Sequence, residues 1–164
     1  MNPTNQELEV PMKSLTNHDY FMNEALKEAK LAFDKGEIPV GAVIVLNNEI
    51  IARAHNLRES TNDPTSHAEV NAIKKASKFL NSWRLNECSL YVTLEPCSMC
   101  AGAMVQARIK NLYFGAYDGK SGSVSSVIKL LNNPFNHIIK YEGGILEKES
   151  NILLKSFFKT LRNK

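Results

Sequence analysis

The sequence predicts a single domain of the α/β class, in which strands and helices alternate along the chain and pack in layers. The chain has 164 residues, a length that suits one domain, and 43% of them are hydrophobic, which is enough to build a core. Segments with apolar residues at helical spacing alternate with short apolar runs, and this alternation is typical of helices layered on a sheet. Residues 1–15 are expected to form a tail, so the domain is assigned to residues 16–164.

The first part of the domain is predicted to be a helix followed by a β-hairpin. Thr16 begins a capping box, and apolar residues then recur every three or four positions until Gly36, which suits a helix end. Residues 40–46 and 49–54 are two apolar runs joined by a pair of asparagines. Asparagine tolerates the positive φ angles of a tight hairpin turn, so the two runs are expected to pair as strands.

The rest of the domain is predicted to alternate between helices and strands. A second helix is expected to begin near Ser66. A strand at residues 89–93 leads to Pro96, which suits the first turn of a helix and so puts Cys97 at a helix entrance, with Cys100 on the same helical face. The remaining predicted elements are a strand at residues 111–115, a short helix at 125–131, an edge strand at 137–141 and a closing helix at 146–161.

Composition and charge narrow the class of protein. The net charge is only +3, but the last fourteen residues carry four basic side chains and no acidic one, which suggests an anionic partner. Three cysteines are too few for a disulfide framework, and the N-terminus lacks a basic-then-apolar signal segment, so a cytoplasmic protein is expected. No apolar run approaches the roughly 20 residues that span a bilayer, so membrane insertion is not expected.

One imidazole, two thiols and one carboxyl group form the most informative pattern in the chain. His67 and Glu69 are separated by one residue, and Cys97 and Cys100 follow in the order Pro-Cys-x-x-Cys. Three such ligands leave a tetrahedral zinc ion with an open fourth position, which is the arrangement of catalytic zinc sites. The same spacing is the signature of zinc-dependent deaminases. We therefore predict one Zn²⁺ per chain, held by His67, Cys97 and Cys100.

The predicted surroundings of these residues suit that chemistry. His67 and the two cysteines are expected in the first turns of two helices, whose N-termini carry partial positive charge and favour thiolates. A zinc ion at this position would bring a bound water close to ionisation near neutral pH. Glu69 is not needed as a ligand, so it could accept the proton of that water and return protons to the ring nitrogen and the departing amine.

Each motif residue also has an ordinary structural interpretation. Ser66 and Glu69 have the spacing of a capping box, so Glu69 alone could be a helix-start residue. A Cys-x-x-Cys pair alone could be a redox pair or half of a structural zinc site. Cys88 could close the site as a fourth ligand, although at the start of a strand we expect a small buried side chain. The conjunction of the histidine, the carboxyl group and both cysteines favours catalysis.

The predicted closing helix has a basic face. Lys155, Lys159 and Arg162 recur at helical spacing and are predicted to contact the phosphates of RNA. The alternative is a solvated basic face without a partner. The opposite, packing face is expected to consist of Leu154, Phe157, Phe158 and Leu161.

Nearly the whole chain after the tail resembles the bacterial tRNA-specific adenosine deaminases, which belong to the cytidine deaminase-like superfamily. The stretches that carry the resemblance are 37–43 (EIPVGAV), 55–59 (HNLRE), 63–69 (DPTSHAE), 93–103 (TLEPCSMCAGA), 114–122 (FGAYDGKSG) and 136–137 (NH). The resemblance implies a three-layer α/β/α fold with a central mixed five-stranded sheet, and a homodimer whose anticodon pocket is built from both chains. It also implies that Asn56 contacts the flipped base and that Asp118 lies in a loop that binds the nucleotide.

Together, the motif and the resemblance predict hydrolytic deamination of the wobble adenosine to inosine in the anticodon stem-loop of an arginine tRNA, by a zinc-activated water. Loop bases are already unstacked, so such an enzyme need not open a duplex. Two alternatives stay open. One is a deaminase of a free base or nucleoside, such as guanine or cytosine, which would need only the pocket. The other is an inert, zinc-stabilised RNA-binding subunit, which would have no use for Glu69.

Overall fold

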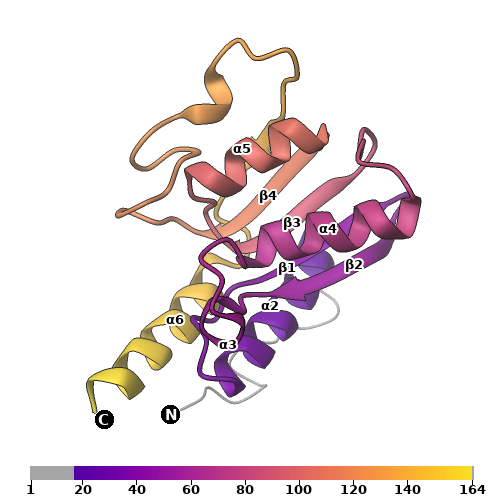
Figure 1. The fold of residues 1–164 in the computed structure, drawn as a ribbon. Coiled ribbons are helices and arrows are strands. Elements are labelled where there is room, and N and C mark those ends of the chain that lie inside the picture. Colours follow the sequence, from indigo (N-terminus) through magenta and orange to yellow (C-terminus); the bar gives the residue numbers. More distant parts are fainter. Residues whose placement is uncertain (1–16, 164) are drawn as a thin grey trace.

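The computed structural model describes residues 17–163, which form one sheet with helices on both faces (Figure 1). The strands are β1 (Gly41–Leu46), β2 (Glu49–His55), β3 (Ser89–Leu94), β4 (Asn111–Ala116) and β5 (Lys140–Glu142). Their order in the sheet is β2-β1-β3-β4-β5. β1 pairs antiparallel with β2 and β3, whereas the pairs β3 with β4 and β4 with β5 are parallel. The predicted mixed five-stranded sheet is confirmed.

The helices make the outer layers of the fold. They are α2 (Asn17–Asp34), α3 (Arg58–Thr61), α4 (Ala68–Leu80), α5 (Ser98–Ala107), the 3₁₀ helix η2 (Leu130–Asn132) and α6 (Glu147–Arg162). α4 and α5 cover one face of the sheet, and α2 and α6 cover the other (Figure 1). Alternate residues of β1 follow this division, because Ala42 and Ile44 pack toward α4 and α5 whereas Val43 and Val45 pack toward α2. The predicted α/β/α layering is confirmed.

The turns that the sequence predicts in the first part of the domain are also present. α2 ends at Asp34, and Gly36 follows with a φ angle of +76°. The hairpin turn between β1 and β2 consists of Asn47 and Asn48, with φ angles of 51° and 65°. Both asparagines therefore adopt the left-handed conformation that a two-residue hairpin loop requires.

α2 passes very close to β1 at Gly41. A Cβ atom at this position would lie 2.0 Å from the carbonyl oxygen of Ala25 and 2.3 Å from the backbone nitrogen of Ala29. Only glycine allows that approach, so Gly41 fixes the distance between the helix and the strand.

The predicted short helix at residues 125–131 is wrong. In its place the chain makes successive turns and then the single 3₁₀ turn of η2. The backbone N–H groups of Val124, Ser125 and Ser126 all donate to one carboxylate oxygen of Glu95. This buried acceptor, distant in the sequence, shapes the segment around itself and competes with helix formation.

Two further differences have similar causes. The edge strand is Lys140–Glu142 rather than residues 137–141, because its partner β4 begins only at Asn111, which is opposite Lys140. The one-turn helix α3 was not predicted. The carboxylate of Glu37 accepts the N–H groups of Glu59 and Ser60 and so stabilises the first turn of α3.

Two predictions lie outside the described residues, namely the N-terminal tail and the capping box that begins at Thr16. Within residues 17–163, no helix combines the length and apolar character needed to cross a bilayer.

Candidate active site

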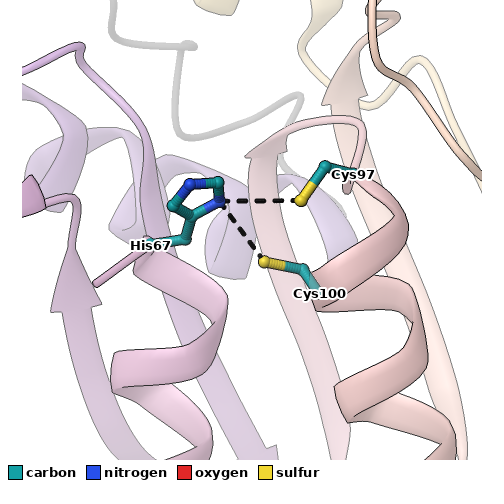
Figure 2. Close-up of side chains that lie close together, drawn as sticks. All are labelled: His67, Cys97 and Cys100. Carbon is teal, nitrogen blue, oxygen red and sulfur yellow. Dashed lines mark hydrogen bonds between the residues drawn. The ribbon is translucent and has the colours of Figure 1, made fainter. Parts of the chain in front are cut away.

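His67, Cys97 and Cys100 lie together between the starts of α4 and α5 (Figure 2). Nδ1 of His67 is 3.6 Å from Sγ of Cys97 and 3.5 Å from Sγ of Cys100. A tetrahedral zinc ion with Zn–N bonds of about 2.0–2.1 Å and Zn–S bonds of about 2.3 Å would hold its nitrogen and sulfur ligands about 3.6 Å apart. Both the chemistry of the donor set and its spacing therefore fit zinc.

The ends of two helices bring these side chains together. His67 is the N-cap residue of α4 and Cys97 is the N-cap residue of α5, each with extended backbone, while Cys100 lies in the first turn of α5. His67 and Cys97 therefore directly precede the first turns in which the sequence places them. Neither N-cap side chain makes a capping hydrogen bond, and both point into the space between the helices (Figure 2).

Ser66 does not form a capping box with Glu69, because His67 occupies the N-cap position. The amide Nδ2 of Asn71 instead donates to Oγ of Ser66 at 3.1 Å and to the carbonyl oxygen of His55 at 3.1 Å. Asn71 thereby ties the end of β2 to the segment that carries His67.

The pKa values of the three clustered groups are shifted by their contacts with one another. The hydrogen bond with Cys100 and the imidazole of His67 together outweigh burial and lower the pKa of Cys97 to about 4. The interaction with Cys97 and burial together raise the pKa of Cys100. The hydrogen bond with Cys97 raises the pKa of His67. A thiolate at Cys97 is the form that binds soft cations.

Glu69 is buried beside this cluster without belonging to it. It is the second residue of α4, is only 4% exposed and lies outside the group of three ligand side chains. Burial and, to a smaller extent, the charge of Cys97 raise the pKa of Glu69 to about 7. A carboxyl group in this position can exchange protons with a molecule bound in front of the cluster.

A small pocket of about 150 Å³ opens onto the cluster and onto Glu69. Asn56 and Asp118, the two residues predicted to bind substrate, both line it. The structure therefore brings them to one cavity with His67, Cys97 and Glu69. The lining residues are Ile38, Val40, Asn56, Arg58, His67, Ala68, Glu69, Leu94, Glu95, Cys97, Asp118 and Ser121.

Asn56 and Asp118 are both held by their own loops. Oδ1 of Asn56 accepts the N–H of Arg58 at 3.2 Å. The carboxylate of Asp118 accepts the N–H of Lys120 at 3.0 Å and the hydroxyl of Ser121 at 2.8 Å. These bonds fix the direction of both side chains, so the polar wall of the pocket is formed before any ligand arrives.

Arg58, Glu95 and Ser121 also line the pocket, although no motif in the sequence assigns them a role. All three fall within stretches that carry the family resemblance. That resemblance was the available signal, but the residue types alone do not distinguish pocket residues from ordinary loop residues.

Cys88 is a core residue. It is 1% exposed, packs in the same apolar cluster as Leu90 and lies outside the group formed by His67, Cys97 and Cys100. Burial raises the pKa of its thiol, which keeps it neutral. This is the small buried side chain that the sequence suggests.

The three basic residues predicted on α6 do not all line the same groove. Lys155 and Arg162 line a shallow groove together with Lys120, Phe158 and Leu161, whereas Lys159 does not line it. The expected packing face is partly wrong, because Phe158 and Leu161 are 40% and 47% exposed. Phe157 is buried as expected, and the helix also buries Ser150 and Leu153.

Comparisons with known proteins agree with this geometry. The MafB19-like deaminase family matches residues 16–162. A tRNA-specific adenosine deaminase of Bacillus subtilis is 50% identical over 151 residues, which cover 92% of this chain and 94% of the relative. A solved structure from a study of A-to-I editing by tRNA:A34 deaminases at the wobble position is 44% identical with a TM-score of 0.80, covering 82% of this chain and 99% of the other. A solved guanine deaminase from Bacillus subtilis is 34% identical with a TM-score of 0.61, covering 91% of this chain and 96% of the other.

Proposed function

Because the chain belongs to the MafB19-like deaminase family and, within it, to the bacterial tRNA-specific adenosine deaminases, we propose that it converts the wobble adenosine of an arginine tRNA to inosine. The reaction replaces the amine on C6 of adenine with the oxygen of a water molecule and releases ammonia. The observation that carries the proposal is the buried carboxyl group of Glu69, which shares one pocket with His67 and Cys97.

His67, Cys97 and Cys100 would hold one zinc ion per chain. Their donor atoms lie within 4.8 Å of one another. No other His, Cys, Asp or Glu in residues 17–163 joins this group, so a fourth position would remain for water. A bound zinc ion would supply a water that ionises near neutral pH.

Glu69 would move the protons of the reaction. Its carboxylate would take one proton from the attacking water and deliver it to the ring nitrogen beside C6, and would then take the second proton from the same oxygen and deliver it to the departing amine. Its position in the first turn of α4, after the N-cap residue His67, keeps it beside the metal ligands. Burial excludes competing water from the carboxyl group.

Asn56 and Asp118 would form the polar wall against which the adenine base rests. Both line the pocket, and both are oriented by hydrogen bonds within their loops. The apolar side chains of Ile38, Val40 and Leu94 line the same pocket, and an aromatic ring can pack against them. A small pocket of this kind suits a single base that leaves its stack, rather than a longer piece of RNA.

The groove beside α6 would hold the RNA backbone. Lys120 lies two residues after Asp118 in the chain, so the groove begins close to the pocket loop. Lys155 and Arg162 continue its basic lining, and the exposed ring of Phe158 provides a surface on which a base can stack. These features favour an RNA substrate over a free base.

We further propose that the chain forms a homodimer in the cytoplasm. Four large apolar side chains, between 44% and 61% exposed, lie in the segment between the pocket loop and β5: Val127, Ile128, Phe135 and Ile138. An exposed apolar group of this size is typical of a surface that another chain covers. Reducing conditions would preserve the thiols of the metal site. A solution mass of one chain at micromolar concentration would refute the dimer.

A free-base deaminase is the second candidate, because a solved guanine deaminase shares 34% identity with the chain. The deciding experiment incubates the purified protein with an arginine tRNA anticodon stem-loop, adenosine, guanine and cytidine, and identifies each deaminated product by mass. We expect inosine from the stem-loop only. Turnover of guanine or cytidine would support the second candidate, and no product from any substrate would support an inert RNA-binding subunit.

A further inference from the structure

Glu95 is a buried carboxylate between the sheet and the metal site. It follows β3 directly, precedes Pro96 and Cys97, and is 2% exposed. It lines the pocket, yet it belongs neither to the group of metal ligands nor to the residues that the proposed reaction uses. A buried carboxylate needs strong hydrogen-bond partners, and those of Glu95 reveal its role.

The carboxylate of Glu95 accepts hydrogen bonds from one loop, residues 118–126. Oε1 accepts the N–H of Asp118 at 3.1 Å and also the hydroxyl of Ser126. Oε2 accepts the N–H groups of Val124, Ser125 and Ser126 at 3.1, 2.8 and 3.0 Å. A single side chain thus binds both ends of the loop.

The middle of the loop is pressed against the same carboxylate. A Cβ atom at Gly122 would lie 2.4 Å from Cδ of Glu95, so only glycine fits there. The N–H of Ser123 donates to the carbonyl oxygen of Pro96 at 2.8 Å. The loop is therefore attached to the segment that also carries Cys97.

This loop supplies one wall of the pocket, through Asp118 and Ser121. We propose that Glu95 is a positioning residue, which holds the loop so that Asp118 and Ser121 meet the target base at a fixed distance from the metal ligands. The proposal rests on the proposed function and adds a residue that sets substrate fit without touching the reacting atoms.

Glu37 offers a matched control, because it is the corresponding carboxylate of the opposite wall. It is fully buried, and its oxygens accept the N–H groups of Glu59 at 3.0 Å and Ser60 at 2.7 Å. These residues belong to α3, which begins at the pocket residue Arg58. Replacing either carboxylate removes a buried anchor, but each anchor holds a different loop.

The first test measures amide hydrogen exchange in the protein without substrate. In Glu95→Gln we expect exchange at the amides of Val124, Ser125 and Ser126 to accelerate at least about tenfold, while the amides of α3 stay at wild-type rates. Glu37→Gln should show the reverse. Ser126→Ala removes one hydrogen bond with little risk to folding and should give a smaller acceleration at the same amides. Unchanged exchange at these amides in both Glu95→Gln and Ser126→Ala would overturn the proposal.

The second test is a double-mutant cycle on the deamination of the tRNA stem-loop. Glu95→Gln should raise KM about tenfold with little change in kcat, whereas loss of folded enzyme would lower kcat and leave KM unchanged. Ser121→Ala should add little to Glu95→Gln but should keep its full effect in Glu37→Gln, because Glu95 alone acts through that loop. Additive effects of Glu95→Gln and Ser121→Ala would overturn the proposal. A wild-type enzyme that deaminates no tRNA would refute the proposed function, and the exchange rates would still decide whether Glu95 holds the loop.

Discussion

Glu69 is buried beside the predicted metal ligands, and this position favours a role in proton transfer over a role in helix capping. Glu69 is 4% exposed and lies two residues after His67 in the chain. Since His67 is the N-cap residue and its side chain makes no cap hydrogen bond, Glu69 has no part in a capping box with Ser66. The proton-transfer role remains, and it has a direct test.

Glu69→Gln keeps the shape of the side chain and removes its ability to carry a proton. We expect kcat for tRNA deamination to fall by at least about 10²–10⁴-fold, the usual contribution of general acid–base catalysis, with zinc content unchanged. Single-turnover assays with metal analysis of the same sample would measure both quantities. Near-wild-type turnover in a zinc-loaded Glu69→Gln protein would remove Glu69 from the mechanism.

The three cysteines allow a matched test of the metal site. Cys97→Ser and Cys100→Ser should lose most of the one zinc per chain that the wild type is expected to bind, because a hydroxyl is a far poorer zinc ligand than a thiolate. Cys88→Ala is the control, since Cys88 is as buried as Cys100 but lies outside the ligand group. It should keep its zinc. Metal loss from the Cys88 variant would mean that the site is closed by four protein ligands.

Spacing in the sequence could predict the ligands because each ligand type is rare and chemically specific. His67, Cys97 and Cys100 meet as that spacing indicates. Glu95 and Ser121 could not be assigned in this way, because their roles depend on contacts between segments that are distant along the chain. A buried glutamate next to proline has no distinguishing pattern of its own.

The helix α3 is stabilised by one buried carboxylate, that of Glu37. Burial alone would raise the pKa of Glu37, but the hydrogen bonds from Ser60 and Glu59 outweigh it and lower the pKa below its ordinary value of 4.5. A carboxylate with a lowered pKa stabilises the fold fully above the unfolded value and loses that contribution as the pH falls through the folded value.

Glu37→Gln should therefore change the pH dependence of stability. The difference in unfolding free energy between the wild type and this variant should be largest above about pH 5 and should shrink as the pH falls below the ordinary value of 4.5. Urea unfolding at several pH values would measure it. Glu49→Gln, at an exposed position of β2, is the control and should change stability little at any pH. A difference that grows toward low pH would contradict this account of Glu37.

The basic residues of α6 allow a test of where the RNA binds, because only some of them line the groove. Replacing both Lys155 and Arg162, which line the groove, with Gln should weaken tRNA binding most at low salt. If each contacts one phosphate, the slope of log affinity against log salt should fall by about 1.4–1.8 in magnitude. Lys159→Gln is the matched control, because Lys159 does not line the groove. An equal effect of the control would show that the RNA does not follow the groove.

The elements that the sequence could predict are those whose signals are local. The helix α2, the Asn47–Asn48 hairpin and the closing helix follow from periodicity and turn residues close together in the chain. The segment at residues 125–131 could not be predicted, because its backbone bonds to the distant side chain of Glu95. The packing face of α6 was partly misassigned because exposed aromatic residues such as Phe158 carry the same pattern as buried ones.

The order of the strands in the sheet determines where the candidate active site lies. β3 is the central strand of the sheet, with β1 and β4 on either side, and the segments that follow β2 and β3 carry the pocket residues Asn56 and Glu95. α4 and α5 bring the metal ligands to the same end of the sheet (Figure 1). Periodicity predicts the strands but not which of them are neighbours. The family resemblance implies a mixed five-stranded sheet, which the structure confirms, and the order β2-β1-β3-β4-β5 is given by the structure alone.

We propose that this chain deaminates one adenosine in a tRNA. The most direct measurement incubates the zinc-loaded wild-type protein with full-length arginine tRNA and locates inosine by mass mapping of nuclease fragments. We expect a mass increase of about one dalton, from replacement of an amine by oxygen, at the wobble nucleotide alone, and no change in a tRNA with guanosine at that position. Inosine at other positions, or free guanine converted faster than the tRNA, would contradict the account.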